Sequence, residues 1–105
     1  EMGAGTGSAT GFVLNSLTKG GTQRYSSYTY TDVSTSFFTQ GEEKFSNYED
    51  IDYRLYDMEK TPEEQGIEPE SYDLVIASCV VHVTANVVNA LKNIRQLLKP
   101  GGQTV

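Results

Sequence analysis

The feature that most constrains the fold is the opening stretch of the chain, Glu1-Met2-Gly3-Ala4-Gly5-Thr6-Gly7. This stretch is typical of the end of a buried strand that runs into a glycine-rich turn, after which Ser8 opens a helix. Glycine at every second position lets the backbone take positive φ and lets a ligand approach the main chain closely. A turn between a strand and a helix N-terminus is where nucleotide-like cofactors dock in α/β sheets. The stretch therefore predicts a cofactor site, in a domain cut out of something longer.

The first half of the chain continues with alternating helix and strand patterns. A helix is predicted over residues 8–18, with a stop at Lys19-Gly20-Gly21. Aromatic and β-branched residues predict a strand from residue 25 that ends at Asp32. Ser34 is the expected N-cap of a second helix over residues 35–46, which Gly41 weakens.

The second half repeats the alternation. A strand is predicted over residues 52–56, followed at 59–71 by a charged loop or short helical turn that holds Pro62, Gly66 and Pro69. Residues 72–78 are a continuous apolar run typical of a strand buried in a parallel sheet. Residues 85–98 predict a helix that Lys99-Pro100-Gly101-Gly102 ends, and residues 103–105 could begin another strand. The positions that follow helical spacing are Val88, Leu91, Ile94 or Arg95, and Leu98.

This order of elements predicts the α/β class: a Rossmann-like, mostly parallel sheet with flanking helices, in one partial domain over residues 1–105. Right-handed crossovers bring the carboxyl ends of parallel strands to one edge. Those ends carry the glycine turn, Asp32, Asp57 and residues 78–82. We therefore expect a ligand crevice at this edge.

Composition excludes several classes of protein. The net charge of −6 weighs against binding to a nucleic-acid backbone, and the acidic clusters are typical of solvated faces and loops. No apolar run approaches the roughly 20 residues of a membrane-spanning helix, so no membrane contact is expected. The single cysteine, Cys79, fits a reducing compartment, and we expect a cytoplasmic location without a signal peptide. No metal site is expected.

The glycine turn alone does not identify the cofactor. Dinucleotide enzymes usually carry a further glycine where Ser8 follows Gly7 here, and the Gly-Lys-Ser/Thr of a phosphate-binding P-loop is absent from the sequence. Asp32 lies 25 residues past Gly7, after a strand, where its two carboxylate oxygens could accept from two ribose hydroxyls. The alternative is that Asp32 merely caps the second helix.

A resemblance to a known family narrows the choice of cofactor. The Glu-x-Gly-x-Gly-x-Gly stretch, Thr-Asp-Val-Ser at 31–34, the Asp that closes the third strand, Tyr-Asp-Leu-Val-Ile-Ala-Ser at 72–78 and Leu-Leu-Lys-Pro-Gly-Gly at 97–102 occur in order along the chain. Together they resemble a class I S-adenosylmethionine-dependent methyltransferase. More narrowly, residues 28–38, 72–84 and 93–102 are similar to the C-methyltransferase domain of fungal highly reducing polyketide synthases.

The resemblance implies roles for residues at the start of the chain. Glu1 and the turn formed by Gly3, Gly5 and Gly7 would hold the methionine part of S-adenosylmethionine. Asp32 would bind the ribose hydroxyls. Carboxylates at Glu1 and Asp32 suit a cationic sulfonium better than a pyrophosphate, since like charges held close together cost free energy.

It also implies roles further along. Asp57 and the adjacent Met58 would contact the edge and face of the adenine, and Ser78 and Cys79 would line the pocket near the sulfonium. An Asn often stands in the family where Cys79 stands here, which implies that a polar contact to the cofactor is weakened or lost. From its neighbours in sequence, Cys79 is interpreted as a buried, inert thiol. It lacks the Pro-Cys pair of methyltransferases that act on cytosine C5, and the stretch lacks the Asp/Asn-Pro-Pro-aromatic motif of those that act on exocyclic amines of bases.

His82 is the only histidine of the chain and the candidate catalytic residue. One interpretation is a partly buried histidine with a satisfied hydrogen bond. The other is a general base, because His82 lies just beyond a strand's carboxyl end and C-methylation requires removal of a proton next to a carbonyl. The similar domains place a catalytic base here, working with a downstream Glu that we expect beyond Val105.

The resulting hypothesis is the cofactor-binding half of a C-methyltransferase domain in a polyketide synthase. Its reaction would methylate the α-carbon of a β-keto thioester on an acyl carrier protein, alongside other domains of the same synthase, and the fragment itself would be inactive. A free-standing small-molecule O- or N-methyltransferase and a silent, methyltransferase-like structural module are the alternatives. Open sheet edges invite pairing, so a homodimer is also considered.

Overall fold

The chain was analysed as a computed structural model that describes residues 1–78 and 86–105. These residues form two compact units. The first unit comprises Glu1 and Gly3–Leu55, and the second comprises Met2 and Tyr56–Val105. Two predicted site residues, Cys79 and His82, lie outside the described residues.

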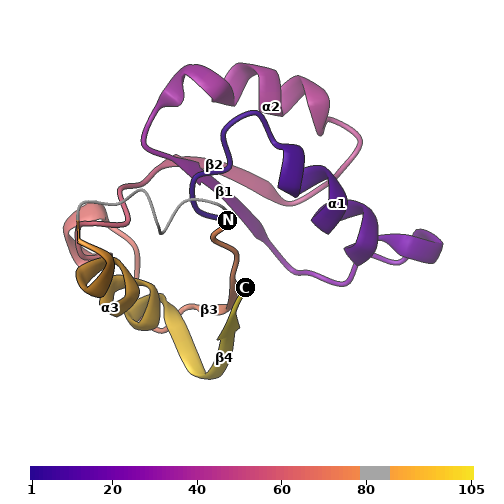
Figure 1. The fold of residues 1–105 in the computed structure, drawn as a ribbon. Helices are drawn as coiled ribbons and strands as arrows, with labels where there is room; N and C mark the ends of the chain where they lie inside the picture. Colours follow the sequence, from indigo (N-terminus) through magenta and orange to yellow (C-terminus); the bar gives the residue numbers. More distant parts are fainter. Residues whose placement is uncertain (79–85) are drawn as a thin grey trace. The chain divides into compact units, whose positions relative to one another are not determined.

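The first unit is a pair of parallel strands with two α-helices (Figure 1). Strands β1 and β2 pair in register from Tyr28 opposite Ile51 to Asp32 opposite Leu55, which confirms the predicted parallel pairing. Strand β1 begins three residues later than the sequence predicted. The elements in chain order are α1 (Ser8–Leu17), η1 (Lys19–Gly21), β1 (Tyr28–Asp32), η2 (Thr35–Phe37), α2 (Phe38–Lys44) and β2 (Ile51–Leu55).

The helix ends of this unit follow from local chemistry. Gly7 precedes α1 with a left-handed φ of 84°, and the Thr18 hydroxyl donates to Leu14 O at 2.7 Å where α1 ends. Ser34 caps the second helical segment, as predicted, because its side chain accepts from Ser36 N at 3.3 Å. That segment starts as a short 3₁₀ turn and becomes α-helical only at Phe38.

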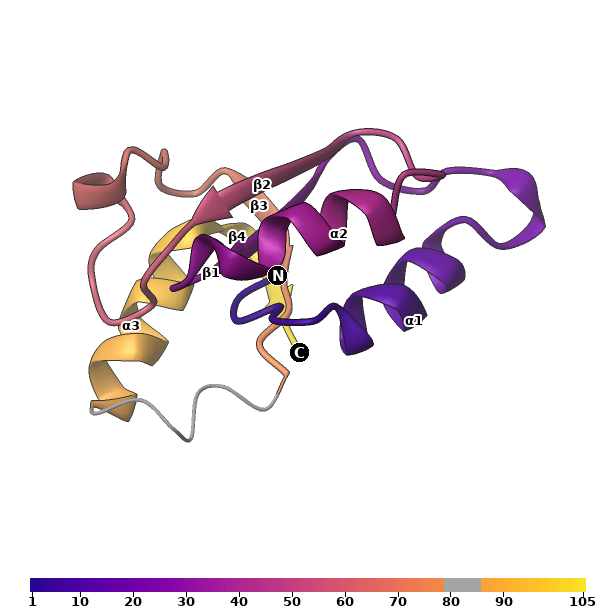
Figure 2. The same cartoon turned by 90° about the horizontal axis from the view of Figure 1, so that it is seen from above.

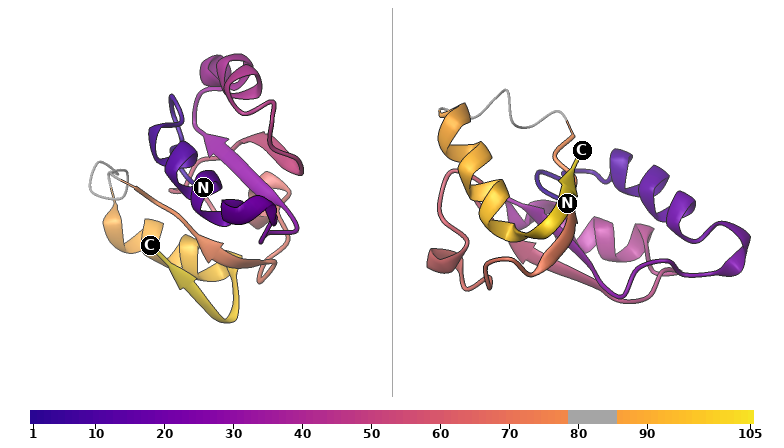
Figure 3. Two further views of the ribbon diagram at one scale, coloured as in Figure 1. Left: turned by 90° about the vertical axis from the view of Figure 1, so that its right-hand side faces the viewer. Right: turned by 90° about the horizontal axis from the view of Figure 1, so that it is seen from below.

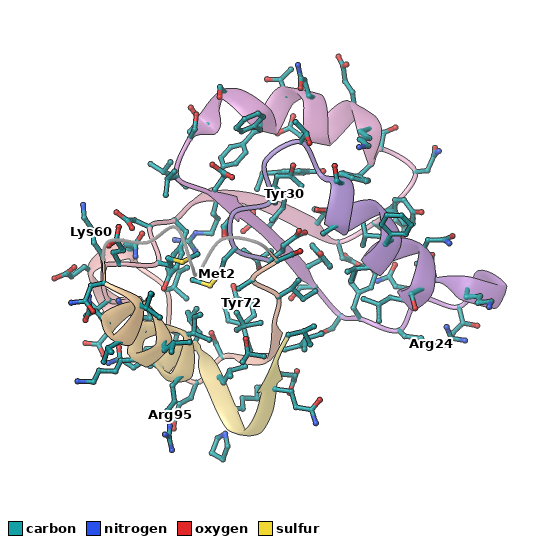
Figure 4. All side chains as sticks on the ribbon, viewed as in Figure 1. Met2, Arg24, Tyr30, Lys60, Tyr72 and Arg95 are labelled. Atoms are coloured by element: carbon teal, nitrogen blue, oxygen red, sulfur yellow. The ribbon has the colours of Figure 1, made fainter. Side chains whose placement is uncertain are left out.

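Aromatic packing forms the centre of the first unit. Tyr30 of β1 is fully buried (labelled in Figure 4), and its ring centroid lies 5.1 Å from that of Tyr53 and 6.2 Å from that of Phe45. A Cβ at Gly41 would come within 3.2 Å of the Tyr53 ring. The glycine that weakens the helix in sequence therefore makes room for these rings, and packing outweighs intrinsic propensity.

The second unit is also a parallel strand pair with one α-helix. It contains η3 (Glu63–Gln65), β3 (Tyr72–Val75), α3 (Val87–Leu97) and β4 (Leu98–Thr104), and α3 packs against both strands (Figures 2 and 3). Tyr72 pairs with Leu98, but Leu74 pairs with Gln103. The ladder is therefore irregular at residues 99–102, where the sequence predicted the turn that ends the helix.

The core of the second unit lies between α3, β3 and the loop after β2. Its members are Met2, Tyr56, Met58, Ile67, Val75, Ala90, Ile94 and Leu97. Strand β3 is less buried than its apolar sequence suggested, because Leu74 is 40% exposed. Val75, which ends the strand, and Ile76, which follows it, are buried.

The buried face of α3 differs from the face that apolar spacing indicated. Val88 and Leu91 are 65% and 48% exposed, so they lie outside the core. The buried positions are Ala90, Asn93, Ile94 and Leu97. Asn93 hid this face from sequence reasoning, since a polar residue on the buried side interrupts the apolar pattern; its side-chain amide donates to Met58 O at 2.9 Å, which satisfies the buried group.

Candidate cofactor-binding site

The glycine turn of the first unit needs glycine for its backbone. Gly3, Gly5 and Gly7 have φ of 61°, 54° and 84°, all in the left-handed region. At Gly7 an added Cβ would lie 2.7 Å from the Phe45 ring, so Gly7 is required by packing as well. At Gly5 an added Cβ would meet only Gly3 O, at 4.0 Å, so the space beside its Cα is free, while its N–H donates to Asp32 and its carbonyl accepts from the Tyr30 hydroxyl.

Asp32 ties this turn to the end of β1. Its Oδ2 accepts from Gly5 N at 2.9 Å, and its Oδ1 accepts from Ser34 N at 3.1 Å. The side chain is 8% exposed. Asp32 thus holds the glycine turn and also stabilises the turn that precedes the second helical segment, which was the alternative role considered from the sequence. Each carboxylate oxygen has two lone pairs, so each can accept a further hydrogen bond.

Glu1 lies in a partly buried hydrogen-bond cluster with Thr10 of α1 and Tyr28 of β1. Both hydroxyls donate to the same carboxylate oxygen, Oε2, with the Tyr28 bond at 2.7 Å. Thr10 is 0% exposed and Tyr28 is 6% exposed. Burial, and secondarily the charge of Glu1, raise the pKa of the Tyr28 hydroxyl, so the phenol stays protonated and remains a donor.

The backbone around Glu1 is paired with β1. Glu1 O accepts from Thr31 N at 2.9 Å and from the Thr31 hydroxyl at 2.6 Å, and Ala4 N donates to Thr31 O at 2.9 Å. These bonds join Glu1 and Ala4 to β1, although the structure assigns no strand to the residues before the turn, where the sequence predicted the end of one. They place Glu1, the glycine turn and Asp32 together within the first unit.

The second unit contains the other predicted residues. Asp57 follows β2, and its Oδ1 accepts from Glu59 N at 2.9 Å. The Gln65 side chain brackets the Asp57 backbone, accepting from Asp57 N at 2.6 Å and donating to Asp57 O at 2.8 Å. These contacts fix the loop after β2 by side-chain bonds rather than by a strand ladder.

Met58 and Ser78 differ in exposure. Met58 is 8% exposed and belongs to the hydrophobic core of the second unit, whereas Ser78 is exposed. The backbone oxygen of Glu59, next to Met58, accepts a hydrogen bond from Asn89 Nδ2 at 2.8 Å. The loop that carries Asp57 and Met58 is therefore anchored to α3.

Sequence reasoning missed the supporting residues of both units. The sequence predicts only that Thr10 lies in a helix and Tyr28 in a strand, and no motif marks Gln65 or Asn93. Thr10 is one of several polar residues in its helix, with Ser8, Asn15 and Ser16, so the sequence does not single it out. The others depend on contacts between residues 27 or more positions apart, or on a side chain that folds back onto its own loop.

Within residues 1–78 and 86–105, no group of three or more His, Cys, Asp or Glu side chains is arranged to hold a metal ion. None of the helices described is both long and apolar enough to cross a membrane.

Comparison with known families identifies the class. The sequence model of the family described as "Methyltransferase domain" matches residues 1–104, so the chain belongs to the methyltransferase domain family. The α/β fold with parallel strands, predicted from the sequence, is that of a partial class I methyltransferase.

Curated relatives narrow the class to polyketide synthases. The chain is 48% identical over 106 residues to the polyketide synthase component of lovastatin nonaketide synthase from Aspergillus terreus. It is 47% identical over 104 residues to highly reducing polyketide synthase g433 from a Fusarium species. These matches cover 100% and 98% of this chain but only 3% and 4% of the two relatives.

Solved structures agree. The trans-methyltransferase CalH, crystallised in complex with SAH, is 46% identical with a TM-score of 0.95, and the match covers 98% of this chain and 29% of CalH. The CMeT domain of the citrinin polyketide synthase is 31% identical with a TM-score of 0.86, over 98% of this chain and 26% of that one. The resemblance to S-adenosylmethionine-dependent methyltransferases, and to polyketide C-methyltransferase domains among them, is confirmed.

Proposed function

We propose that this chain is the cofactor-binding part of a domain that methylates the α-carbon of a β-keto thioester carried on an acyl carrier protein. The observation that carries the proposal is the similarity over 98% of the chain to CalH and to the citrinin synthase CMeT domain, together with the synthase relatives. A single family match runs across both compact units, which supports treating them as parts of one domain.

The first unit supplies groups that fit S-adenosylmethionine. Glu1 offers a carboxylate to the cationic methionine part, and Asp32 retains acceptor capacity for the ribose hydroxyls. Beside the Cα of Gly5 there is free space, with Gly3 O as the nearest atom at 4.0 Å from a built Cβ. When bound, the cofactor supplies an electrophilic methyl group on a sulfonium, whose transfer leaves a neutral thioether.

Residues of the second unit complete the proposed set. We assign Asp57 and Met58 to the adenine, on the basis of the resemblance and of the loop that anchors them to α3. Ser78 and Cys79 are assigned to the pocket near the sulfonium from their sequence positions. The burial of Met58 means that its contact would come from a small exposed part of the side chain.

The proposed chemistry requires a base. His82 would accept the proton of the substrate's α-carbon, and the electron pair left behind would take up the methyl group that the bound cofactor supplies. The resemblance implies a partner Glu that orients His82, and we expect it downstream of Val105. Beyond positioning the reactants, the residues of this chain have little further chemistry to perform.

Product analysis tests the reaction type. The full-length protein, incubated with labelled cofactor and a β-keto acyl carrier protein, should yield a C–CH₃ product. An O–CH₃ or N–CH₃ product would instead support a small-molecule methyltransferase, and no product at all would support a silent module. In the same protein, His82→Ala should abolish methyl transfer; full-rate transfer by that variant would remove His82 from the proposal.

Calorimetric titration tests the isolated 105-residue chain. We propose that it shows no turnover, because the Glu partner is outside it, and the titration measures whether its residues alone bind the cofactor. Turnover by the isolated chain would contradict this. The proposed partners are the carrier protein and neighbouring synthase domains. Self-association through strand edges is a separate prediction that sedimentation of the chain tests.

A further inference from the structure

We propose that Thr10 and Tyr28 are positioning residues that aim the Glu1 carboxylate at the amino-acid part of the cofactor. This inference rests on the proposed function, since it assigns a supporting role to residues of the same site. Neither hydroxyl was expected at the site from the sequence. Their contribution is to orient Glu1, without touching the cofactor themselves.

The geometry of the cluster supports this role. Both hydroxyls donate to Oε2 of Glu1, so that oxygen is engaged twice, while Oε1 receives no hydrogen bond from the described residues. Oε2 thus accepts hydrogen bonds from the protein, and Oε1 can accept from a donor outside the cluster. Hydrogen bonds to a carboxylate are stronger than those between neutral groups, so the side chain is held in one orientation.

The donors themselves are fixed. Thr10 is 0% exposed within α1, and Tyr28 is 6% exposed within β1. The Tyr28 ring also packs edge-on against Tyr25, with centroids 6.0 Å apart. A helix, α1, and a strand, β1, therefore hold the Glu1 side chain, which precedes the glycine turn. A carboxylate left without such donors in a buried setting would be costly.

The charge balance favours a cationic ligand group. Among the described residues, Glu1 Oε2 accepts from two neutral hydroxyls and from no Lys or Arg side chain, while the ammonium of Glu1 itself donates to Thr29 O at 2.7 Å. An ammonium group of a ligand could donate a charge-assisted hydrogen bond to the remaining oxygen, Oε1. The methionine part of S-adenosylmethionine carries one; the adenosine part does not.

This difference gives a sharp test in the full-length protein. S-adenosylhomocysteine carries the amino-acid part, whereas 5′-methylthioadenosine has the same adenosine and a thioether but lacks it. We expect Tyr28→Phe and Thr10→Val to raise the Kd of S-adenosylhomocysteine roughly tenfold. The Kd of 5′-methylthioadenosine should stay unchanged.

Three further variants serve as controls. Thr10→Ser keeps the hydroxyl and should retain affinity for both ligands. Tyr25→Phe removes a phenol hydroxyl that donates to Glu49 O at 2.7 Å, outside the cluster, and should leave both Kd values as in the parent. In a Glu1→Gln background, Tyr28→Phe should add little, because the two residues act through one another.

The outcomes separate the possibilities. Equal loss of both ligands in Tyr28→Phe would show a general structural effect and overturn the positioning role, as would unchanged binding of both. Should Thr10→Val fail to fold, Tyr28→Phe and Thr10→Ser still decide. If the parent protein bound neither ligand, the proposed function itself would fail, and the positioning role with it.

Discussion

The Asp32 carboxylate accepts a hydrogen bond from the backbone N–H of Gly5 at 2.9 Å, across 27 positions of sequence. Its other oxygen accepts from Ser34 N at 3.1 Å. A residue proposed to bind the ribose therefore also holds the glycine turn in place. Binding and local stability are coupled in this one side chain, so a substitution there changes both.

Replacement of Asp32 by Ala should lower the free energy of unfolding of the 105-residue chain by about 1–3 kcal/mol, because two backbone N–H groups lose their buried acceptors. Urea denaturation followed by circular dichroism measures the change. The control is Asp73→Ala, whose side chain is 85% exposed and pairs with Lys99 at 3.5 Å. That variant should stay within about 1 kcal/mol of the parent. Equal costs would show that the two bonds of Asp32 contribute nothing specific.

Gly7→Ala should be more destabilising than Gly20→Ala. Both glycines have φ near 80°, at 84° and 80°, so both alanines meet the same left-handed strain of about 1–2 kcal/mol. At Gly7 the added Cβ also lies 2.7 Å from the Phe45 ring, whereas at Gly20 nothing lies within 4 Å. Overpacking adds about 1–3 kcal/mol at Gly7 alone.

Urea midpoints of the two glycine variants measure this difference directly. Combining Gly7→Ala with Phe45→Leu, which trims the ring, should recover part of the packing cost beyond what the two single changes add up to. Purely additive effects would remove the Phe45 contact as the cause.

The two faces of α3 should respond differently to truncation. Ile94→Ala, at a position 2% exposed, should lower the free energy of unfolding by about 2–4 kcal/mol. Leu91→Ala, at a position 48% exposed, should cost less than about 1 kcal/mol. Thermal and urea unfolding of the two variants measure the two losses in the free energy of unfolding. A larger loss of unfolding free energy for Leu91→Ala than for Ile94→Ala would mean that the face indicated by apolar spacing is the buried one.

Alkaline pH should destabilise the chain through its buried tyrosines. Burial raises the pKa of Tyr30 and of Tyr56 to about 12, from an ordinary value near 10. The folded chain therefore keeps protons that the unfolded chain releases. Stability from these groups is fully present below about pH 10 and is lost as the pH rises from about 10 to 12. Urea midpoints across this range measure the slope.

Tyr56→Phe provides the matched test of that slope. Tyr56 Oη is buried, and among the described residues it has no hydrogen-bond partner. Removing it should leave stability at neutral pH unchanged or slightly raised, because no bond is lost. Above about pH 10 the variant should lose stability less steeply than the parent. An identical slope would mean that Tyr56 does not contribute to alkaline unfolding.

Local pattern was sufficient for the elements and the class of ligand. The glycine turn, the cap at Ser34 and the helix stop after α3 depend on residues close in sequence, so their chemistry is readable along the chain. Parallel pairing followed from the alternation of strands and helices. Family membership likewise depends on motifs in order, which the sequence carries in full.

Only the tertiary structure decided which side chains support the site and which face of α3 is buried. Thr10 and Tyr28 meet at Glu1 because a helix and a strand distant in sequence pack together, and no local pattern encodes that meeting. Asn93 is buried because its amide reaches the Met58 backbone, which offsets the cost that hides such positions from a hydrophobic pattern. Composition and spacing report what each segment prefers alone; packing and hydrogen bonds between segments settle the rest.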